Sequence, residues 1–424
     1  MQIEISQSSE LLTNRCGLLQ VQAFLNHHKI AELVDEHLPQ SNSNHSYKAS
    51  AFTTSLLHMF LDGATTLEEV NMLKADKAFR QVAGLVAIPS SDAIGDWLRR
   101  VGKQNAEEKI LRVNQILFSR VSGDKFTLDI DGTIIEADKG DAQKSYKGIV
   151  GYHPLLGIIA ENNIAVHIEF RTGNQSPQGG LVKFIEQCFL SSGNRIACVR
   201  SGSAGYQKDV IKSIVKAGKF YSITAKHTEP VMEAIATIPE IEWRRGYDDH
   251  GCATLFEVAE TSLAFIGKKH TSRLLVKRTR REGQIEAFDQ HPYTYWAVIT
   301  NLPVESFPLQ KALGFHQQRG RMEKSIGEIK EHFNLGHLPC GQFHANSSFF
   351  ALGILGYNII QMMKMSVHWQ SVEHASIKTI RYKLLHVAGK LVSHSNKLFL
   401  KIATMNEYVD IIRNTYLHYQ LSPV

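Results

Sequence analysis

The sequence predicts an α/β fold in which a mixed β-sheet follows a helical N-terminal part and precedes further helices. Three changes of pattern carry this prediction. Residues 9–38 and 47–118 place apolar side chains at helical spacing. From Lys125 the pattern alternates apolar and polar residues and is rich in Phe, Thr and Ile, as in a strand. From Leu309 to the end, helical spacing returns.

These changes divide the chain into five parts. We expect helices over 1–120, a first α/β part over 121–225, a β-rich insertion over 226–305, a second part of the same core over 306–365, and a C-terminal helical region over 366–424. Within the first α/β part, the expected strands are 153–162, 164–173, 195–203 and 219–225, and the expected helices are 178–190 and 206–217. Within the insertion, the segments beginning at 242, 263, 272 and 293 are typical of strands.

Composition limits the class of protein and its compartment. The 424 residues include 47 Lys+Arg and 41 Asp+Glu, a net charge of +6 that favours an anionic partner without locating it. Five scattered cysteines without a CxxC pair indicate reduced thiols, and the first residues lack the pattern of a signal peptide. Polar residues interrupt the apolar stretch 349–365, which therefore predicts a buried helix instead of a membrane span. We expect a cytoplasmic protein.

Two aspartates on the first predicted strand are the first candidate site. Side chains alternate along a strand, so Asp129 and Asp131 point to the same face, where burial is costly unless a metal or cation neutralises them. Solvated carboxylates beside a turn are an equally good interpretation of this pair alone.

A helix in the second part of the core supplies the second candidate. His316, Arg319, Glu323 and Lys330 are separated by offsets of 3, 7 and 14 residues from the first, which places them on one helical stripe. One carboxylate among cations suits a site where Glu323 holds a metal while Arg319 and Lys330 hold phosphates. A solvated charged face would show the same pattern.

The insertion contains the third candidate, an indole and a run of cations. Trp296 either fills the core or provides a surface on which an unpaired base stacks. The run Lys277, Arg278, Arg280 and Arg281 either contacts DNA phosphates or forms a solvated hairpin edge.

Together these residues resemble the DDE transposases of bacterial insertion sequences, over roughly residues 9–415. Asp131-Gly132-Thr133 resembles the first aspartate of that family, which is followed by a small residue and Thr or Ser. The family signature Y-x2-R-x3-E-x6-K is matched at Arg319, Glu323 and Lys330, and His316 stands in the place of the tyrosine. The segments SYKGIVGYHPLLGII and RTGNQSPQGG also look like those that follow the first aspartate in these transposases.

The resemblance implies a ribonuclease-H-like core, action as a homodimer, and no membrane partner. It also implies binding of double-stranded DNA at the element's terminal inverted repeats and at target DNA, with the N-terminal helices 1–120 as a DNA-binding domain. It also implies two Mg²⁺ ions, with Mn²⁺ as a substitute, held by Asp131, Glu323 and a second aspartate in a segment resembling R-A-D-S-x-Y-Q. Here residues 200–207 read RSGSAGYQ, so Gly202 stands at that aspartate's position.

Because glycine has no carboxylate, we expect a transposase whose cleavage and strand transfer are impaired. One alternative is a transposase-derived DNA-binding protein or repressor without catalysis. Another is an unrelated metal-dependent nuclease on the same core, whose gene would not lie between terminal repeats.

Overall fold

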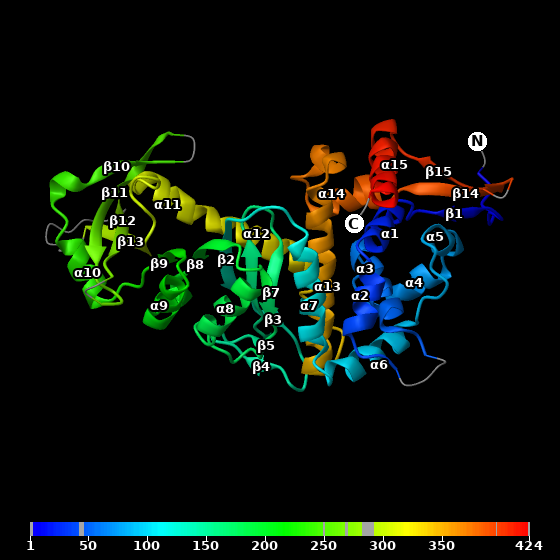
Figure 1. Cartoon of the computed structure of the whole chain (residues 1–424), viewed down its shortest axis with the longest axis horizontal. Coiled ribbons are helices and arrows are strands. Elements are labelled where there is room, and N and C mark those ends of the chain that lie inside the picture. Colours follow the sequence, from blue (N-terminus) through cyan, green and yellow to red (C-terminus); the bar gives the residue numbers. More distant parts are fainter. Residues whose placement is uncertain are drawn as a thin grey trace.

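The computed structural model describes residues 3–41, 46–248, 251–267, 270–281, 292–395 and 397–422. The molecule is elongated, with the inserted strands at one end, the first α/β part in the middle and a bundle of helices at the other end (Figure 1). The long helix α13 (Phe343–Lys364) lies beside α7 (Ala106–Ser119) between the sheet and the bundle (Figure 1).

The middle of the sheet has the order expected for a ribonuclease-H-like core. Three antiparallel strands, β7 (Ala165–Glu169), β6 (Leu155–Ile159) and β2 (Phe126–Gly132), are followed by two strands parallel to β2, β8 (Ile196–Ser201) and β9 (Phe220–Thr224). Helix α8 (Leu181–Ser191) connects β7 to β8, and α9 (Lys208–Lys216) connects β8 to β9. Both helices bury apolar side chains against the sheet. The predicted α/β fold is confirmed.

The insertion continues this sheet instead of forming a separate one. Strands β10 (Arg244–Tyr247), β11 (Ala253–Leu263), β12 (Ser272–Arg280) and β13 (Tyr293–Thr300) pair antiparallel in sequence order, and β13 pairs with β9. Helix α10 (Glu229–Ala236) precedes them. The strand predicted to begin at residue 263 is wrong, because β11 ends there.

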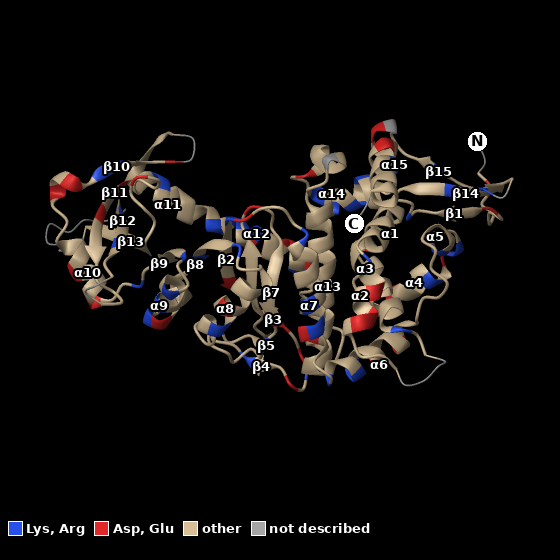
Figure 2. Ribbon diagram, in the orientation of Figure 1, with Lys and Arg blue, Asp and Glu red and all other residues tan. Residues whose placement is uncertain are grey.

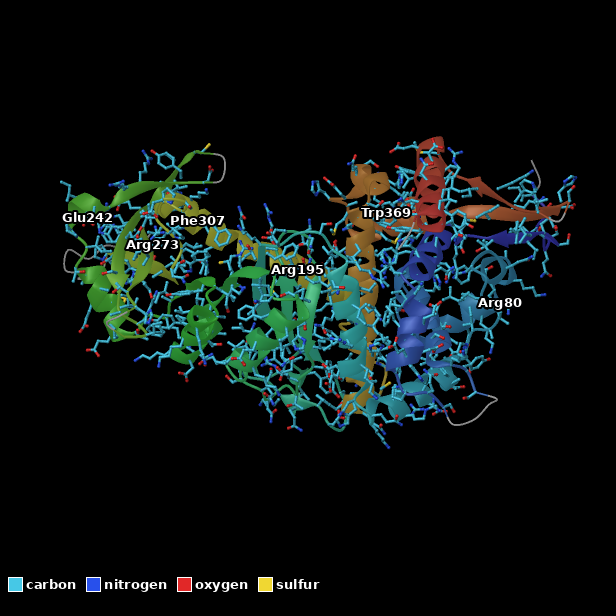
Figure 3. The ribbon with its side chains drawn as sticks, in the orientation of Figure 1. Arg80, Arg195, Glu242, Arg273, Phe307 and Trp369 are labelled. Carbon is cyan, nitrogen blue, oxygen red and sulfur yellow. The ribbon has the colours of Figure 1, made fainter. Side chains whose placement is uncertain are left out.

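Arg273 of β12 joins strand β11 to the segment that follows β13. Its guanidinium pairs with Glu260 and donates to the carbonyls of Leu302 and Phe307, at 2.8 and 2.9 Å (Figure 3).

The helical bundle is built from both ends of the chain. The N-terminal helices are α1 (Leu18–His27), α2 (Ile30–His37), α3 (Ala49–Asp62), α4 (Val70–Ala75), α5 (Lys77–Val82) and α6 (Ser91–Gly102), with a 3-10 turn η1 (Leu67–Glu69). They share one hydrophobic core with α13, which is buried along most of its length, and with residues 369–419. In the part of the chain that the structure describes, no helix has the length and apolar character to cross a membrane.

The C-terminal region departs from the all-helical prediction. After α14 (Ile377–Ile380) and a π-helical turn η7 (Arg381–Leu385), strands β14 (Ala388–His394) and β15 (Lys397–Ala403) form a hairpin, and α15 (Asn406–Leu421) follows. The short strand β1 (Leu11–Thr13) pairs with β14. Trp369, in the 3-10 helix η6 (Val367–Val372), donates its indole N–H to Gln20 and Thr415, at 3.2 and 3.1 Å, and so links α1 to α15 (Figure 3).

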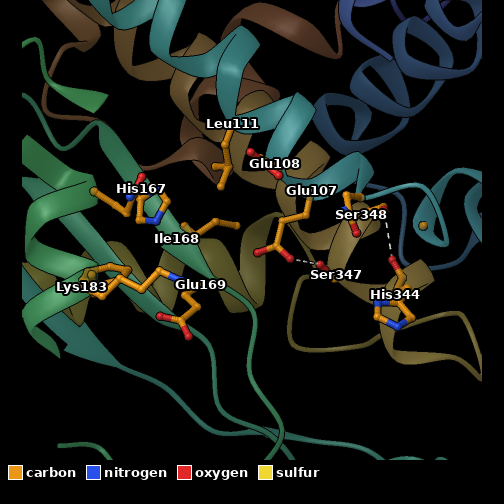
Figure 4. Close-up of a pocket in the computed structure, with 14 residues that line it drawn as sticks. Glu107, Glu108, Leu111, His167, Ile168, Glu169, Lys183, His344, Ser347 and Ser348 are labelled. Atoms are coloured by element: carbon orange, nitrogen blue, oxygen red, sulfur yellow. Dashed lines mark hydrogen bonds between the residues drawn. The ribbon is translucent and has the colours of Figure 1, made fainter. Parts of the chain in front are cut away.

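The edge strand β7 is covered by polar side chains from helices instead of by another strand. Asn358 of α13 exchanges hydrogen bonds with both backbone groups of Ala165, and Asn114 of α7 also donates to the Ala165 carbonyl. At the other end of β7, the carboxylate of Glu107 accepts from the Phe170 amide at 3.0 Å and from the Ser347 hydroxyl (Figure 4). The backbone groups of Ala165 and the amide of Phe170 are therefore satisfied without a partner strand.

Candidate active site

The two predicted aspartates do share a face of β2, but their environments differ. Asp129 is buried, and both of its carboxylate oxygens accept from Arg200 of β8, at 2.6 and 2.7 Å. Burial raises the pKa of Asp129, while the hydrogen bonds and charge of Arg200 act in the opposite direction. Arg200 also donates to the Phe315 carbonyl at 2.5 Å. The charge of Asp129 is therefore neutralised by Arg200. Through its bond to the Phe315 carbonyl, Arg200 also links the sheet to the helix that contains Phe315.

Asp131 lies at the end of β2, and its side chain remains 39% exposed. One carboxylate oxygen accepts from the Gly132 amide at 2.9 Å, and the other lies 3.2 Å from an Arg319 guanidinium nitrogen. Both residues line a cavity of about 480 Å³ at the ends of β2 and β8. The structure thus brings Asp131 and Arg319 together as an ion pair.

Gly202 lines the same cavity and directly faces Arg319. A Cβ atom at position 202 would lie 3.4 Å from an Arg319 nitrogen, which is ordinary contact. The backbone there has φ −68° and ψ −169°, a conformation that any residue adopts. The fold therefore does not require glycine at this position, and an acidic side chain would fit where none is present.

Glu323 is exposed in the first turn of α12 (Arg321–Gly327), one turn beyond Arg319, and does not line the cavity. Within the described residues it makes no hydrogen bond or ion pair, and no group of three His, Cys, Asp or Glu side chains is placed to hold a metal ion. Mg²⁺ prefers oxygen ligands in octahedral geometry, and a pair of such ions needs several carboxylates. The residues present do not fit a two-metal site.

The helical stripe is assembled from several kinds of helix. Helix α11 (Leu309–Gln317) continues through a 3-10 turn η4 (Gln318–Gly320) and α12 into a π-helix η5 (Glu328–His332). Lys330, on the π-helix, donates to the Ile134 carbonyl at 2.9 Å and so holds the segment that follows Asp131. Arg319 contacts the end of β2 and Lys330 contacts the segment after it, while their binding of phosphates stays a prediction.

The prediction that His316 contacts DNA is wrong. The ring is buried, its Nδ1 lies 2.8 Å from the Ser222 hydroxyl, and its Nε2 lies 3.0 Å from the Thr224 hydroxyl, both on β9. Burial lowers the pKa of His316 to about 3, and the nearby Arg319 and Arg200 act in the same direction. His316 therefore anchors α11 to the sheet as a neutral imidazole and leaves no ring nitrogen for a ligand.

The basic run of β12 divides between the two faces of the sheet. Arg278 is buried, its guanidinium pairs with Glu240 and Glu257, and it lies over the rings of Trp243 and Tyr293. It is therefore a structural residue, and its prediction as a DNA contact is wrong. Arg280 and Arg281 are exposed at the end of the strand.

Lys277 and Trp296 lie directly opposite each other on β12 and β13, on the face covered by α11. The Lys277 ammonium lies 3.8 Å from the centre of the Phe256 ring. Trp296 is half-buried, packs beside the cluster formed with α11, and lies 5.6 Å from His316 between ring centres. Trp296 therefore contributes to packing and keeps part of its surface free.

The cavity is also lined by residues that the sequence analysis does not predict as site residues, among them Tyr146, His153 and Gln178. The signal was available, because they lie within the two segments that resemble those following the first aspartate of the transposases. His153 also explains the small residue after Asp131: a Cβ atom on Gly132 would lie 2.7 Å from its Nε2.

The fold and this site define the class of protein: a ribonuclease-H-like core, enlarged by an insertion, with an acidic residue at the end of its first strand. The family model described as transposase DDE domain group 1 matches residues 1–423, and the chain belongs to this family. Members of the family generally use a divalent metal ion.

Among solved structures, the chain is similar to piggyBac transposase in a synaptic complex with hairpin DNA, with a TM-score of 0.45 and 8% identity, covering 94% of this chain and 80% of that one. No curated protein sequence matches the chain.

Proposed function

We propose that this chain is an insertion-sequence transposase that binds the terminal inverted repeats of its element as a homodimer, and that its cleavage and strand transfer are strongly impaired. Membership of the transposase family supports the first part. One observation carries the proposed impairment. Gly202 supplies no second carboxylate beside Asp131, and the side chain that lies next to both residues is Arg319.

The charge of the cavity explains the impairment. Phosphoryl transfer between DNA strands in this class relies on paired divalent ions held by carboxylates. Here one carboxylate is absent, Glu323 does not line the cavity, and Asp131 is already paired with a guanidinium. Such a cavity suits the binding of a DNA phosphate by Arg319 better than it suits the capture of Mg²⁺.

The proposed DNA surface near the site is smaller than the sequence alone indicates. Lys277, Trp296 and Arg319 lie on the face of the sheet that carries α11 and α12, and Arg280 and Arg281 are exposed at its edge. His316 and Arg278 are excluded because they are buried and fully paired. Base recognition by the N-terminal helices 1–120 stays part of the proposal.

The decisive experiment restores the missing carboxylate. We expect Gly202→Asp to gain Mg²⁺- or Mn²⁺-dependent nicking of duplexes that carry the element ends, because the backbone at this position accepts any residue. The matched control is Gly202→Asn, which has the same shape without the charge and should show no gain. If Gly202→Asp nicks no better than the unmodified chain, the missing-ligand account is wrong.

The second candidate function is a repressor or dominant-negative partner of an intact transposase. The lack of a three-ligand acidic group among the described residues favours it. Both candidates predict binding to the element ends with a steep salt dependence, but only an impaired enzyme leaves residual nicks. Imperfect inverted repeats flanking the gene would support both candidates against an unrelated nuclease.

A further inference from the structure

The excess of positive charge is confined to the last part of the chain. Residues 306–424 contain 13 Lys+Arg and 6 Asp+Glu, whereas residues 1–305 contain 34 and 35. The N-terminal helices, residues 1–120, are nearly neutral with 12 and 13. Residues 374–406 contain six Lys or Arg, three His and no acidic residue. The electrostatic attraction for an anionic polymer therefore comes from the C-terminal side of the chain.

Half of those six cations lie on one face of the β14–β15 hairpin. In its register, Lys390 is opposite Lys401, Val392 is opposite Phe399, and His394 is opposite Lys397. We call this face, Lys390, Val392, His394, Lys397, Phe399 and Lys401, the outer face. The other face carries the buried Leu391, and Leu400 and Ile402 pack against the core of the bundle. The hairpin is therefore fixed to the bundle by one face and presents cations on the other. Figure 2 shows how Lys and Arg are distributed along the ribbon.

The charges on the outer face are not balanced within the described chain. Like charges directly opposite each other across two strands are destabilising. Lys390 is compensated by an ion pair with Glu10, but Lys397 and Lys401 have no ion pair within the described residues. Between them lies Phe399, 46% exposed, and Leu12 of β1 is 51% exposed next to Lys390. Unpaired cations beside exposed apolar groups indicate a surface that binds an anionic ligand.

The dimensions of the hairpin favour duplex DNA. A two-stranded ribbon fits the major groove, which is about 12 Å wide. The hairpin is two-stranded beyond Leu391, because β1 pairs with β14 only over Gly389–Leu391. Lys397 and Lys401 are four residues apart on β15, which corresponds to about 13 Å along a strand. A ribbon placed across the groove would therefore bring one lysine to the phosphates on each side.

We propose that the outer face of the β14–β15 hairpin binds the duplex of the element ends, with Lys397 and Lys401 on backbone phosphates and Phe399 against the groove. This proposal rests on the proposed function: family membership supports DNA binding, and the hairpin is the surface to which we assign part of that binding. It adds a contact far in sequence from Arg319, Glu323 and Lys330 and from the N-terminal helices.

The test compares full-length variants by fluorescence anisotropy with a labelled duplex over a range of salt concentrations. Each lost phosphate contact reduces the slope of log K against log salt by about 0.9, so Lys397→Ala with Lys401→Ala should reduce it by about 1.8. The matched control, Lys212→Ala with Lys216→Ala, removes two exposed lysines of α9 and should leave the slope unchanged. Lys397→Arg with Lys401→Arg should retain binding.

Thermal unfolding of each variant separates a loss of contact from a loss of fold. Both lysines are exposed and Lys401 lies opposite Lys390, so their removal should not lower the melting temperature. If the unmodified chain binds duplex DNA and the hairpin variant keeps its slope, the hairpin proposal is overturned while the proposed function stands. If the unmodified chain binds no duplex, the proposed function itself fails. Binding to anionic lipid vesicles in place of duplex DNA would also overturn the hairpin proposal.

Discussion

Replacing Arg200 by methionine should expose how strongly the core depends on the Asp129–Arg200 pair. The two side chains are 3% and 2% exposed, so the substitution leaves a carboxylate buried without a cation. Breaking such a pair from one side costs about 3–5 kcal/mol of unfolding free energy. The lost hydrogen bond to the Phe315 carbonyl adds about 1 kcal/mol. We expect Arg200→Met to lose about 4–6 kcal/mol of unfolding free energy.

The matched variant removes both charges. In Asp129→Asn with Arg200→Met no charge is left buried, so the loss should be at least about 2 kcal/mol smaller than in Arg200→Met alone. Urea unfolding, followed by tryptophan fluorescence and far-ultraviolet circular dichroism, measures both values. The reasoning is refuted if the double variant is as unstable as the single one, or if Arg200→Met unfolds like the unmodified chain.

The loss of unfolding free energy in Arg200→Met should depend on pH. Burial already raises the pKa of Asp129, and loss of Arg200 removes the main influence that lowers it. A carboxyl group whose pKa is raised by folding destabilises the folded state above that pKa and is harmless below the value of the unfolded chain. The deficit of Arg200→Met should therefore be full at neutral pH and shrink as the pH falls through the raised pKa of Asp129.

Two further substitutions test the site. Gly132→Ala should lower the unfolding free energy by about 1–3 kcal/mol, because its Cβ atom would lie 2.7 Å from His153 Nε2; unchanged urea unfolding would contradict this contact. His316→Gln should remove an acid-dependent loss of stability. Folding lowers the pKa of His316 from 6.5 to about 3, so the unmodified chain should lose up to about 1.4 kcal/mol per pH unit relative to His316→Gln as the pH falls from 6.5 towards 3, measured by unfolding at stepped pH. Parallel pH profiles would show that the imidazole is not held neutral.

The strands of the core could be predicted from the sequence because their signals are local. Strand β2 alternates side chains between two faces, and β6 and β8 are continuous buried apolar runs bounded by polar residues. Hairpin β14–β15 has a weaker local signal: β14 reads AGKLVSH, in which apolar and polar residues do not alternate, and only Lys397–Ala403 is rich in apolar residues. The helical spacing on either side of the hairpin therefore favours a helical prediction across it.

The roles of the site residues could be predicted only in part, because a role depends on what lies opposite a side chain. Arg319 and Lys330 were recognised from spacing along one helix, which is a local property. Arg278 and His316 look the same in sequence as exposed DNA contacts, and only the neighbouring strands and helices show that Glu240, Glu257, Ser222 and Thr224 already bind them.

The side chains that cover β7 determine where the sheet can be lengthened. A sheet grows by pairing a new strand with free backbone groups at its edge, and at the two ends of β7 the groups of Ala165 and the amide of Phe170 already bind Asn358, Asn114 and Glu107. The additional strands lie on the β9 side, where β13, β12, β11 and β10 follow in turn. The inserted strands therefore lengthen the molecule at the end away from the helical bundle, and the contact between β7 and the bundle does not involve them.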